Sequence, residues 1–316
     1  MRGMILAAGL GTRLRPLSYE LPKPVIPVLG RPLCTYNMEF LRRTGIKSFV
    51  MNLHTHPKLI QQRVTGWAGK TVRIDFTVEP VILGTGGGIW NARESLKGGT
   101  FVTANGDTIL SFPFAPALAF HRERKALATL ILFPDPGKRY TPVWVTEGGR
   151  ITGFGSEAGE GAKSGFYTGC QILEPELLSN IPPGKASCII RETYTPLVAD
   201  GAPVFGFLSS GRFQEFGTPA DYLEGTLALL SARKQEAARP AAEEDQVTII
   251  PPVHIAPKAK VAPGARVGPG AVIEDGATVA EGASVSRSIL WPGAVLPAGE
   301  QLNGAILTPR RRVQVG

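Results

Sequence analysis

A six-residue hydrophobic period near the C-terminus restricts the fold of this chain more than any other feature. Aliphatic residues recur at intervals of six, at Ile255, Val261, Val267, Ile273, Val279 and Val285. Such a period is typical of stacked repeats, in which each aliphatic side chain points into a prism of short parallel strands. A disordered tail would not keep aliphatic residues in register over so many repeats. We therefore expect residues 247–316 to form a parallel β-helix. It would have about three coils if three hexapeptides close each turn.

The first two thirds of the chain alternate apolar runs with segments of helical spacing. The apolar runs predict strands at residues 4–8, 49–53, 72–78, 101–104 and 127–133. Helix-compatible spacing is found at residues 36–43, 59–65 and 89–96. This alternation is typical of βαβ units, so we expect residues 1–232 to form a doubly wound α/β domain around a mainly parallel sheet.

A change of composition separates the two patterns. A helix is predicted to begin after Thr218 and to run to Leu230. Thr218 would be its capping residue, Pro219 its first-turn proline and Asp221 its first-turn acid. Residues 233–246 are charged, rich in alanine and interrupted by a proline, and they predict a linker to the repeats.

A glycine loop, Gly9-Leu10-Gly11-Thr12, follows the first predicted strand. Its glycines allow backbone N–H groups to approach an anion closely, and Arg13 adds a forked cation suited to phosphate. Lys23 lies between two prolines, whose fixed φ angles restrict the backbone that carries it. A dinucleotide fingerprint would need a third glycine at position 14, which is leucine, and the Gly-Lys-Ser/Thr of a P-loop is absent. We interpret the segment as a site for a nucleoside triphosphate.

Composition narrows the class of protein. The net charge of +8 suits anionic substrates, whereas the basic residues are too dispersed for a nucleic-acid site. We find no 18-residue apolar run to span a membrane and no signal-peptide core. The 3 cysteines are odd in number and widely spaced, which favours free thiols and a reducing, cytoplasmic location.

The string from residue 6 to 33 resembles the signature of the sugar-1-phosphate nucleotidyltransferases, or NDP-sugar pyrophosphorylases: a strand, then Gly-x-Gly-Thr-Arg-Leu-Arg-Pro-Leu, then Pro-Lys-Pro. The resemblance implies a Rossmann-like domain that transfers a nucleotidyl group from an NTP to a sugar 1-phosphate with Mg²⁺. The hexapeptide repeats resemble the left-handed β-helix often appended to this family. Exposed end coils favour docking on another subunit, so we expect a homo-oligomer through the β-helix.

The resemblance also assigns roles to residues. It implies that Arg13, Lys23 and Asp107 are catalytic. Asp107 would hold the metal together with Glu215, which stands where the family has an aspartate in Trp-x-Asp-x-Gly-Thr-Pro. The positions matched to nucleotide binding are Leu6, Ala7, Ala8, Gly9, Gly11, Thr12, Arg13, Glu79, Gly84, Thr85 and Gly106. Those matched to sugar binding are Gly87, Gly88, Asn105, Thr168 and Gly169.

The choice of substrates stays open at this point. Glu79 offers only hydrogen-bond acceptors, which favours guanine, with its adjacent N1–H and 2-amino donors, over uracil or thymine. The order of a short catalytic domain and hexapeptide repeats resembles the mannose 1-phosphate guanylyltransferase branch. We expect residues 83–88 to form a loop, and its Gly-Thr-Gly-Gly-Gly at residues 84–88 resembles a uridylylating subgroup, so UTP stays open as the alternative. No lysine matches the family's sugar-phosphate lysine near Phe154, which keeps a non-catalytic regulatory homologue as the alternative.

Overall fold

The structure is a computed structural model that describes all residues except 70, 136, 138, 156–162, 234–246 and 316. Its backbone divides into two compact units, which we describe separately. The first comprises Met1–Leu10 with Cys34–Gln214, and the second comprises Gly11–Leu33 with Glu215–Gly316. These units do not coincide with the predicted division at residue 232. The predicted linker lies outside the described residues except for Arg233.

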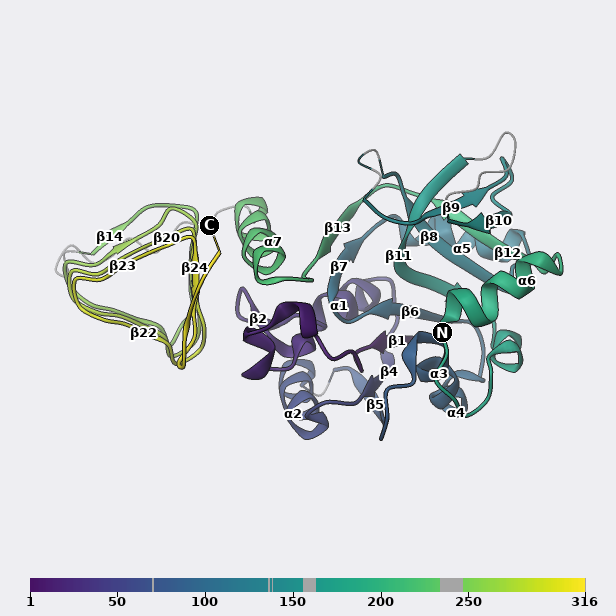
Figure 1. The fold of residues 1–316 in the computed structure, drawn as a ribbon, viewed down its shortest axis with the longest axis horizontal. Helices are drawn as coiled ribbons and strands as arrows, with labels where there is room; N and C mark the ends of the chain where they lie inside the picture. Colours follow the sequence, from purple (N-terminus) through teal and green to yellow (C-terminus); the bar gives the residue numbers. More distant parts are fainter. Residues whose placement is uncertain (70, 136, 138, 156–162, 234–246, 316) are drawn as a thin grey trace. The chain divides into compact units, whose positions relative to one another are not determined.

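A nine-stranded sheet forms the centre of the first unit (Figure 1). Its strands are β1 (Arg2–Leu6), β4 (Ser48–Leu53), β5 (Arg73–Val78), β6 (Phe101–Asn105), β8 (Ala128–Phe133), β9 (Pro142–Val145), β10 (Ile151–Phe154), β11 (Lys163–Leu173) and β12 (Val204–Leu208). The neighbours β6, β1, β4 and β5 are parallel, which confirms the predicted α/β sheet. Strand β11 runs antiparallel to β6, β8 and β9. Strands β7 (Thr108–Ser111) and β13 (Arg212–Glu215) form a separate pair.

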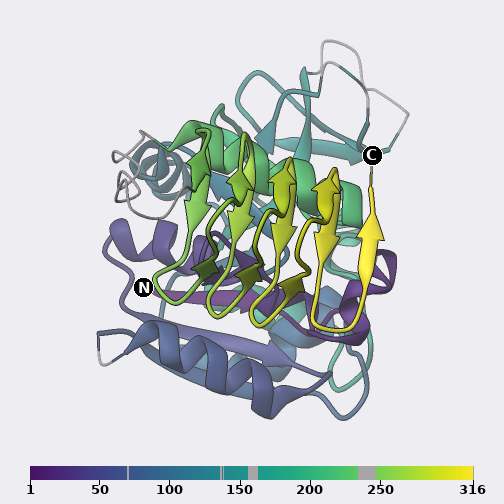
Figure 2. The same ribbon diagram turned by 90° about the vertical axis from the view of Figure 1, so that its left-hand side faces the viewer.

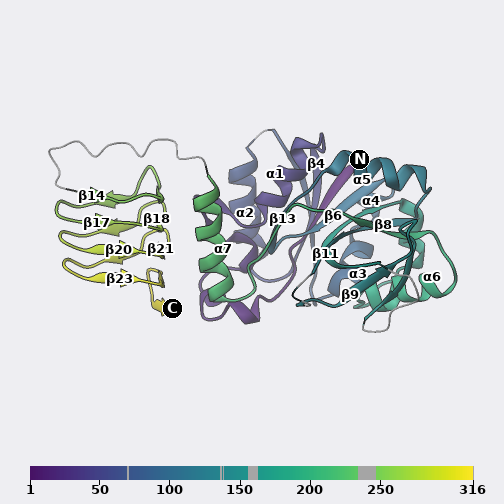
Figure 3. The same cartoon turned by 90° about the horizontal axis from the view of Figure 1, so that it is seen from above.

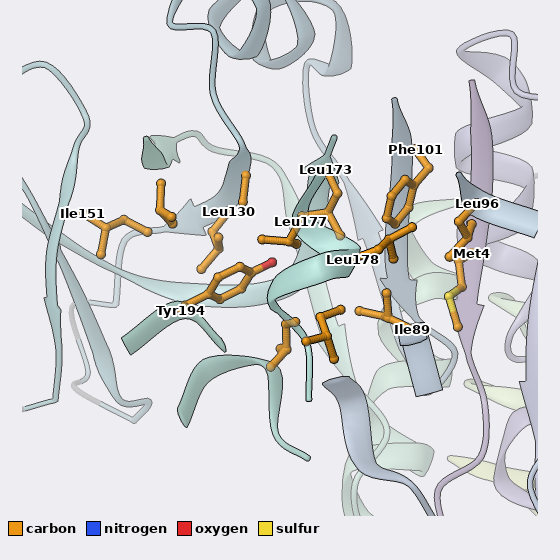
Figure 4. Packing of buried hydrophobic residues seen from close by; sticks show 14 of the residues in the cluster. Met4, Ile89, Leu96, Phe101, Leu130, Ile151, Leu173, Leu177, Leu178 and Tyr194 are labelled. Atoms are coloured by element: carbon orange, nitrogen blue, oxygen red, sulfur yellow. The ribbon is translucent and has the colours of Figure 1, made fainter. Parts of the chain in front are cut away.

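Helices and apolar side chains cover both faces of this sheet. The helices are α1 (Thr35–Arg43), α2 (Pro57–Ala68), α3 (Gly84–Asn91), α4 (Arg93–Leu96), η4 (Pro175–Asn180), η5 (Ile189–Tyr194), α5 (Phe114–Glu123) and α6 (Thr195–Ala199). Met4 belongs to a cluster with Ile89, Phe101 and Tyr194 (Figure 4). The next residue, Ile5, points to the opposite face because strand side chains alternate, and it is fully buried as well. Burial of β1 on both faces is typical of the parallel part of a doubly wound sheet, which is the architecture that the sequence predicted.

The cysteine side chains and the lengths of the helices complete the description of this part of the chain. Cys34, Cys170 and Cys188 are free thiols. Burial raises the pKa of the Cys34 and Cys170 thiols to about 12, so both are inert hydrophobic groups near neutral pH. Among the described residues, no helix has the length and apolar content needed to cross a membrane.

The second unit contains the predicted β-helix, whose coils appear as a triangle in Figure 1 and as a stack in Figures 2 and 3. Its three sheets are β14-β17-β20-β23, β16-β19-β22 and β15-β18-β21-β24, the last extended by antiparallel β25. Their bounds are β14 (Thr248–Ile249), β15 (Val253–Ile255), β16 (Lys260–Val261), β17 (Arg266–Val267), β18 (Ala271–Ile273), β19 (Thr278–Val279), β20 (Ser284–Ser286), β21 (Ser288–Leu290), β22 (Val295–Leu296), β23 (Gln301–Asn303), β24 (Ala305–Leu307) and β25 (Arg312–Gln314).

The stack is longer than the sequence predicted, because the hydrophobic period slips by one residue. Thr248 pairs with Arg266, eighteen positions on, whereas Ser284 pairs with Gln301, only seventeen positions on. The shorter coil contains Arg287, whose positive φ of 42° tightens the corner. After the slip the inward positions are Leu290, Leu296 and Leu302, all buried. Two of the three sheets therefore hold four parallel strands, where about three coils were expected.

The remainder of the second unit consists of α7 (Pro219–Ala232) and the segment Gly11–Leu33. Helix α7 begins as predicted: the Thr218 hydroxyl accepts the Asp221 N–H at 3.1 Å, and the Asp221 carboxylate accepts the Thr218 N–H at 3.0 Å. The segment contains the 3₁₀ helices η1 (Thr12–Leu14), η2 (Leu17–Tyr19) and η3 (Lys23–Val25), then a hairpin of β2 (Pro27–Val28) and β3 (Arg31–Pro32).

The hairpin turn rests on a buried carboxyl group of the β-helix. Leu29 and Gly30 both have positive φ, 48° and 80°, as two-residue hairpin turns require. The Gly30 N–H donates to both oxygens of Glu274, at 3.1 and 3.0 Å, and Glu274 is 1% exposed. Burial raises the pKa of Glu274 to about 7, against the opposing effect of these N–H donors; Asp275 adds to the increase.

This raised pKa predicts that stability falls as pH rises from about 4.5 to about 7. Across that window the folded protein keeps a proton on Glu274 that the unfolded chain releases, so the free energy of unfolding decreases, by at most about 3 kcal/mol. Glu274→Gln should flatten that part of the profile in chemical denaturation between pH 5 and 8. The exposed Glu281, changed to Gln, is the matched control and should leave the slope unaltered. Parallel profiles for wild type and Glu274→Gln would refute the assignment.

Candidate active site

The carboxyl ends of three neighbouring parallel strands reach the same level of the sheet. Leu6 of β1 pairs with Asn52 of β4 on one side and with Asn105 of β6 on the other. Ligands of open α/β sheets bind beyond such ends. The first unit therefore brings the predicted residues after Leu6 and around Asp107 to one edge of the sheet.

A buried asparagine holds the start of the glycine loop. The Ala7 N–H donates to Oδ1 of Asn52 at 2.9 Å, inside the protein. Ala7 and Ala8 are buried, whereas a Cβ atom added to Gly9 would meet nothing within 4 Å. The backbone at Gly9 is therefore open to a ligand, as a phosphate-binding loop requires. Sequence reasoning missed Asn52, although an amide at the carboxyl end of a buried strand was a usable signal.

Glu79 follows β5 and is fixed from two sides. Its Oε1 accepts from Nδ2 of Asn52 at 2.7 Å, and its Oε2 accepts the Leu83 N–H at 3.0 Å. The residue is 1% exposed. The Glu79 carboxylate thus links the ends of β4 and β5 to the start of α3. The expected contact between Glu79 and the base of the nucleotide stays a prediction.

The glycine-rich stretch expected to be a loop forms most of helix α3. This expectation was wrong because the helix packs closely against another segment of the unit: Gly86 N–H donates to the Ser187 carbonyl at 2.9 Å, and the Thr85 hydroxyl accepts the Ile189 N–H at 3.0 Å. A Cβ atom on Gly84 or Gly87 would lie 2.6 Å from the carbonyl oxygens of Ser187 or Lys185.

Gly88 faces the Asn52–Glu79 pair. An added Cβ atom there would lie 2.7 Å from Nδ2 of Asn52 and 2.9 Å from Oε1 of Glu79. The space next to Gly87 and Gly88 is thus filled by protein, not reserved for a sugar. Any sugar contact that these two residues make is left to the backbone and stays a prediction.

The turn that carries Asp107 is anchored on three sides. Gly106 N–H donates to the Leu6 carbonyl at 2.8 Å. Nδ2 of the buried Asn37 donates to the carbonyls of Asn105 and Thr108, at 2.8 and 3.0 Å. Asn37 was not found from the sequence, because nothing local marks a residue of α1 as the partner of a turn after β6. Its contacts fix the backbone on both sides of the half-buried Asp107.

The predicted sugar segment on β11 adjoins the same turn. Gly169 has φ +79°, and a Cβ atom on it would lie 2.3 Å from Nδ2 of Asn105, so only glycine fits there. The Thr168 hydroxyl donates to the Ile131 carbonyl at 2.9 Å and is buried. Thr168 therefore supports the strand with its side chain, which leaves the backbone as the part that could contact a ligand.

The two predicted site cations, Arg13 and Lys23, belong to the second unit. Gly11 has φ +62° and its Cα closely approaches Lys23: an added Cβ would lie 3.0 Å from the Lys23 Cβ. Lys23 is 6% exposed, whereas Arg13, next to Thr12 in η1, is exposed. Nη2 of Arg13 lies 3.5 Å from Oε1 of Glu215, so two of the predicted site residues form an ion pair.

The expected metal ligands are oxygen donors carried by different units: Asp107 by the first and Glu215 by the second. Among the described residues, no group of three or more His, Cys, Asp or Glu side chains is arranged to hold a metal ion. Mg²⁺ is commonly held by only one or two carboxylates together with substrate phosphates, so each of these carboxylates has the chemistry expected of a magnesium ligand, and their common role stays a prediction.

Comparison with known proteins places the chain among enzymes of one kind. Residues 2–232 match the family model described as Nucleotidyl transferase. The mannose-1-phosphate guanylyltransferase of Mycobacterium tuberculosis is 30% identical over 72% of this chain, and the match spans 64% of that relative, less than two thirds of its length. The UTP–glucose-1-phosphate uridylyltransferase of Synechocystis sp. is 29% identical over 77% of this chain and 67% of its own length.

A solved structure shares the fold. The crystal structure of HddC from Yersinia pseudotuberculosis, complexed with GMP-PN, matches with a TM-score of 0.61 over 72% of this chain and 99% of its own. Its sequence identity is 24%.

Proposed function

Because the chain belongs to the nucleotidyl transferase family over residues 2–232, we propose that it transfers a nucleotidyl group from an NTP to a sugar 1-phosphate. The observation that carries the proposal is the shared edge of β4, β1 and β6, where the glycine loop and the Asp107 turn follow aligned strand ends. The products are an NDP-sugar and pyrophosphate.

The proposed reaction needs positioning and charge neutralisation rather than a covalent intermediate. An oxygen of the sugar 1-phosphate attacks the α-phosphorus of the NTP in line, and the bond from that phosphorus to the bridging oxygen of the β-phosphate breaks. Arg13 would hold the leaving β- and γ-phosphates through its forked N–H donors. Lys23 would neutralise charge near the reacting phosphates, and the N–H groups after Ala8 would cradle the nucleotide.

Asp107 and Glu215 are the residues that would hold Mg²⁺, since both present hard oxygen donors of the kind this ion prefers. When bound, the ion neutralises charge that develops on the phosphates. Arg13 and Glu215 form an ion pair in the structure, so a bound triphosphate and Mg²⁺ would compete with this contact.

The proposed substrates are GTP and mannose 1-phosphate. The guanylyltransferase name of the mycobacterial relative supports this pair, and the uridylyltransferase name of the Synechocystis relative supports UTP with another sugar 1-phosphate as the alternative. A panel of GTP, UTP and dTTP with mannose, glucose, N-acetylmuramate and heptose 1-phosphates, read by pyrophosphate release, tests both. A preference for UTP or dTTP would reject the base assignment only. No turnover with any pair, together with binding of an NDP-sugar, would favour the regulatory alternative.

We also propose that the chain is a cytoplasmic homo-oligomer assembled through the β-helix. The final coil ends in β25, whose pairing with β24 is antiparallel, so the parallel stack stops there. Light scattering on the full chain should give a mass at least twice that of one chain. A monomer at micromolar concentration would contradict this proposal.

A further inference from the structure

The segment Gly11–Leu33, which carries Arg13 and Lys23, is attached to the β-helix and to α7 at three separate places. All of these contacts lie within the second unit. Each joins a polar group of the segment to a buried or half-buried side chain from the other end of the chain. One contact, at Glu20, precedes Lys23 in the sequence. The other two, at Pro27 and at the Leu29-Gly30 turn, follow it.

The first attachment is a carboxylate held by the end of the β-helix. Glu20, whose side chain is 7% exposed, accepts from Nε of Arg311 at 2.5 Å and from the Thr308 hydroxyl at 2.8 Å. A charge-assisted bond to a carboxylate removed from water is among the stronger polar contacts in proteins. Because Glu20 lies three residues before Lys23, this contact fixes the chain that enters η3.

The second attachment is a chain of two hydrogen bonds through α7. The Trp291 indole N–H donates to Oη of Tyr222 at 2.9 Å, and the Tyr222 hydroxyl donates to the Pro27 carbonyl at 2.5 Å. Both aromatic residues are buried, and their rings pack edge to face at 6.3 Å. Pro27 lies four residues after Lys23, so this contact fixes the chain that leaves η3. The third attachment, Gly30 on Glu274, fixes the hairpin turn beyond it.

We propose that the β-helix positions the cationic segment of the active site, with Arg311, Trp291 and Glu274 acting as positioning residues for Lys23 and Arg13. This inference rests on the proposed function. It assigns the repeats a part in the reaction that is additional to assembly. Lys23 is buried, and the chain is held three residues before it by Arg311 and four residues after it by Tyr222, so loss of either contact should let its backbone shift. Displacements of about 1 Å in such a group can cost about a hundredfold in rate.

Two full-length variants test the inference by cutting independent attachments. Arg311→Ala removes the charged partner of Glu20 and leaves the Thr308 hydroxyl in place. Tyr222→Phe removes the hydroxyl that joins Trp291 to Pro27 and keeps the ring. We expect each to lower kcat/KM for the NTP by roughly 10- to 100-fold, through both kcat and KM, at temperatures well below the unfolding transition. Arg310→Ala, an exposed neighbour on the same loop, is the matched control and should behave as wild type.

A purely structural role would lower the melting temperature and leave kcat and KM unchanged below it, and that result would overturn the inference. Hydrogen exchange of the amides in residues 11–33 provides a readout independent of turnover: protection there should fall in both variants and stay unchanged in Arg310→Ala. Unaltered protection would overturn the inference as well. A wild-type protein without transfer activity would refute the proposed function itself. If the wild type is active and both variants have the same kcat and KM, only the positioning role is refuted.

Discussion

Replacement of Asp107 by asparagine should lower turnover by roughly two orders of magnitude or more. The substitution keeps the size of the side chain and removes its charge, so the loss would measure the electrostatic part played by the carboxylate. The surrounding turn should persist, because Gly106 and Asn37 hold it through backbone contacts that do not use the Asp107 side chain. Steady-state rates at saturating Mg²⁺ are the measurement.

Two comparisons separate this effect from a general loss of charge or stability. Asp200→Asn, at an exposed acid in the same unit, should leave turnover unchanged. Glu215→Asp should be tolerated or raise turnover, because it restores the residue that the family resemblance leads one to expect. Near-normal activity of Asp107→Asn at saturating Mg²⁺ would remove Asp107 from the reaction, and the metal assignment with it.

Gly88→Ala should destabilise the protein by about 2–3 kcal/mol and weaken nucleotide binding. The new Cβ atom would lie 2.7 Å from the Asn52 amide, so the Asn52–Glu79 hydrogen bond has to break or shift. Asn52 also holds the Ala7 N–H, and the disturbance therefore reaches the glycine loop. Denaturant unfolding and the KM for the NTP are the two measurements.

A second helical glycine gives a control of opposite sign. Gly66 lies in α2, is exposed, and an added Cβ atom would meet nothing within 4 Å. Gly66→Ala should stabilise the protein by about 0.5–1 kcal/mol through reduced backbone entropy of the unfolded chain. If Gly88→Ala were equally stabilising, the close packing at Asn52 would be refuted.

The parts of the fold that follow from local patterns were predicted well. Apolar runs and helical spacing located β4, β5, β6 and α1 within a few residues, and the threonine–proline–aspartate pattern located the start of α7. The repeats were found because their period is carried by single residues. The period was lost after Val285, because one missing residue moved the inward positions to Leu290 and beyond. A search for aliphatic residues at strict intervals of six therefore misses the coils beyond that point.

The parts that depend on distant partners were not predictable in the same way. Residues 84–88 were expected to form a loop, yet they belong to a helix whose glycines make room for groups from other segments, such as the Ser187 carbonyl next to Gly84 and the Asn52 amide next to Gly88. Asn37 has no local signature, since its importance lies in a turn that follows another strand. Asn52 is marked only by its place at the end of a buried strand, which does not reveal that it holds the Ala7 N–H. The motifs of the candidate site could therefore be read from the sequence, whereas the contacts that support them could not.

The attachment of Glu20 to Arg311 joins residues that are 291 positions apart, almost the full length of the chain. Because synthesis runs from the N-terminus, the residues that carry Arg13 and Lys23 are made long before their anchor Arg311. We therefore expect the sheet of the first unit to form early during translation and the segment Gly11–Leu33 to settle only after the β-helix has been made. Such an order would delay the ordering of Arg13 and Lys23 until their distant anchors exist.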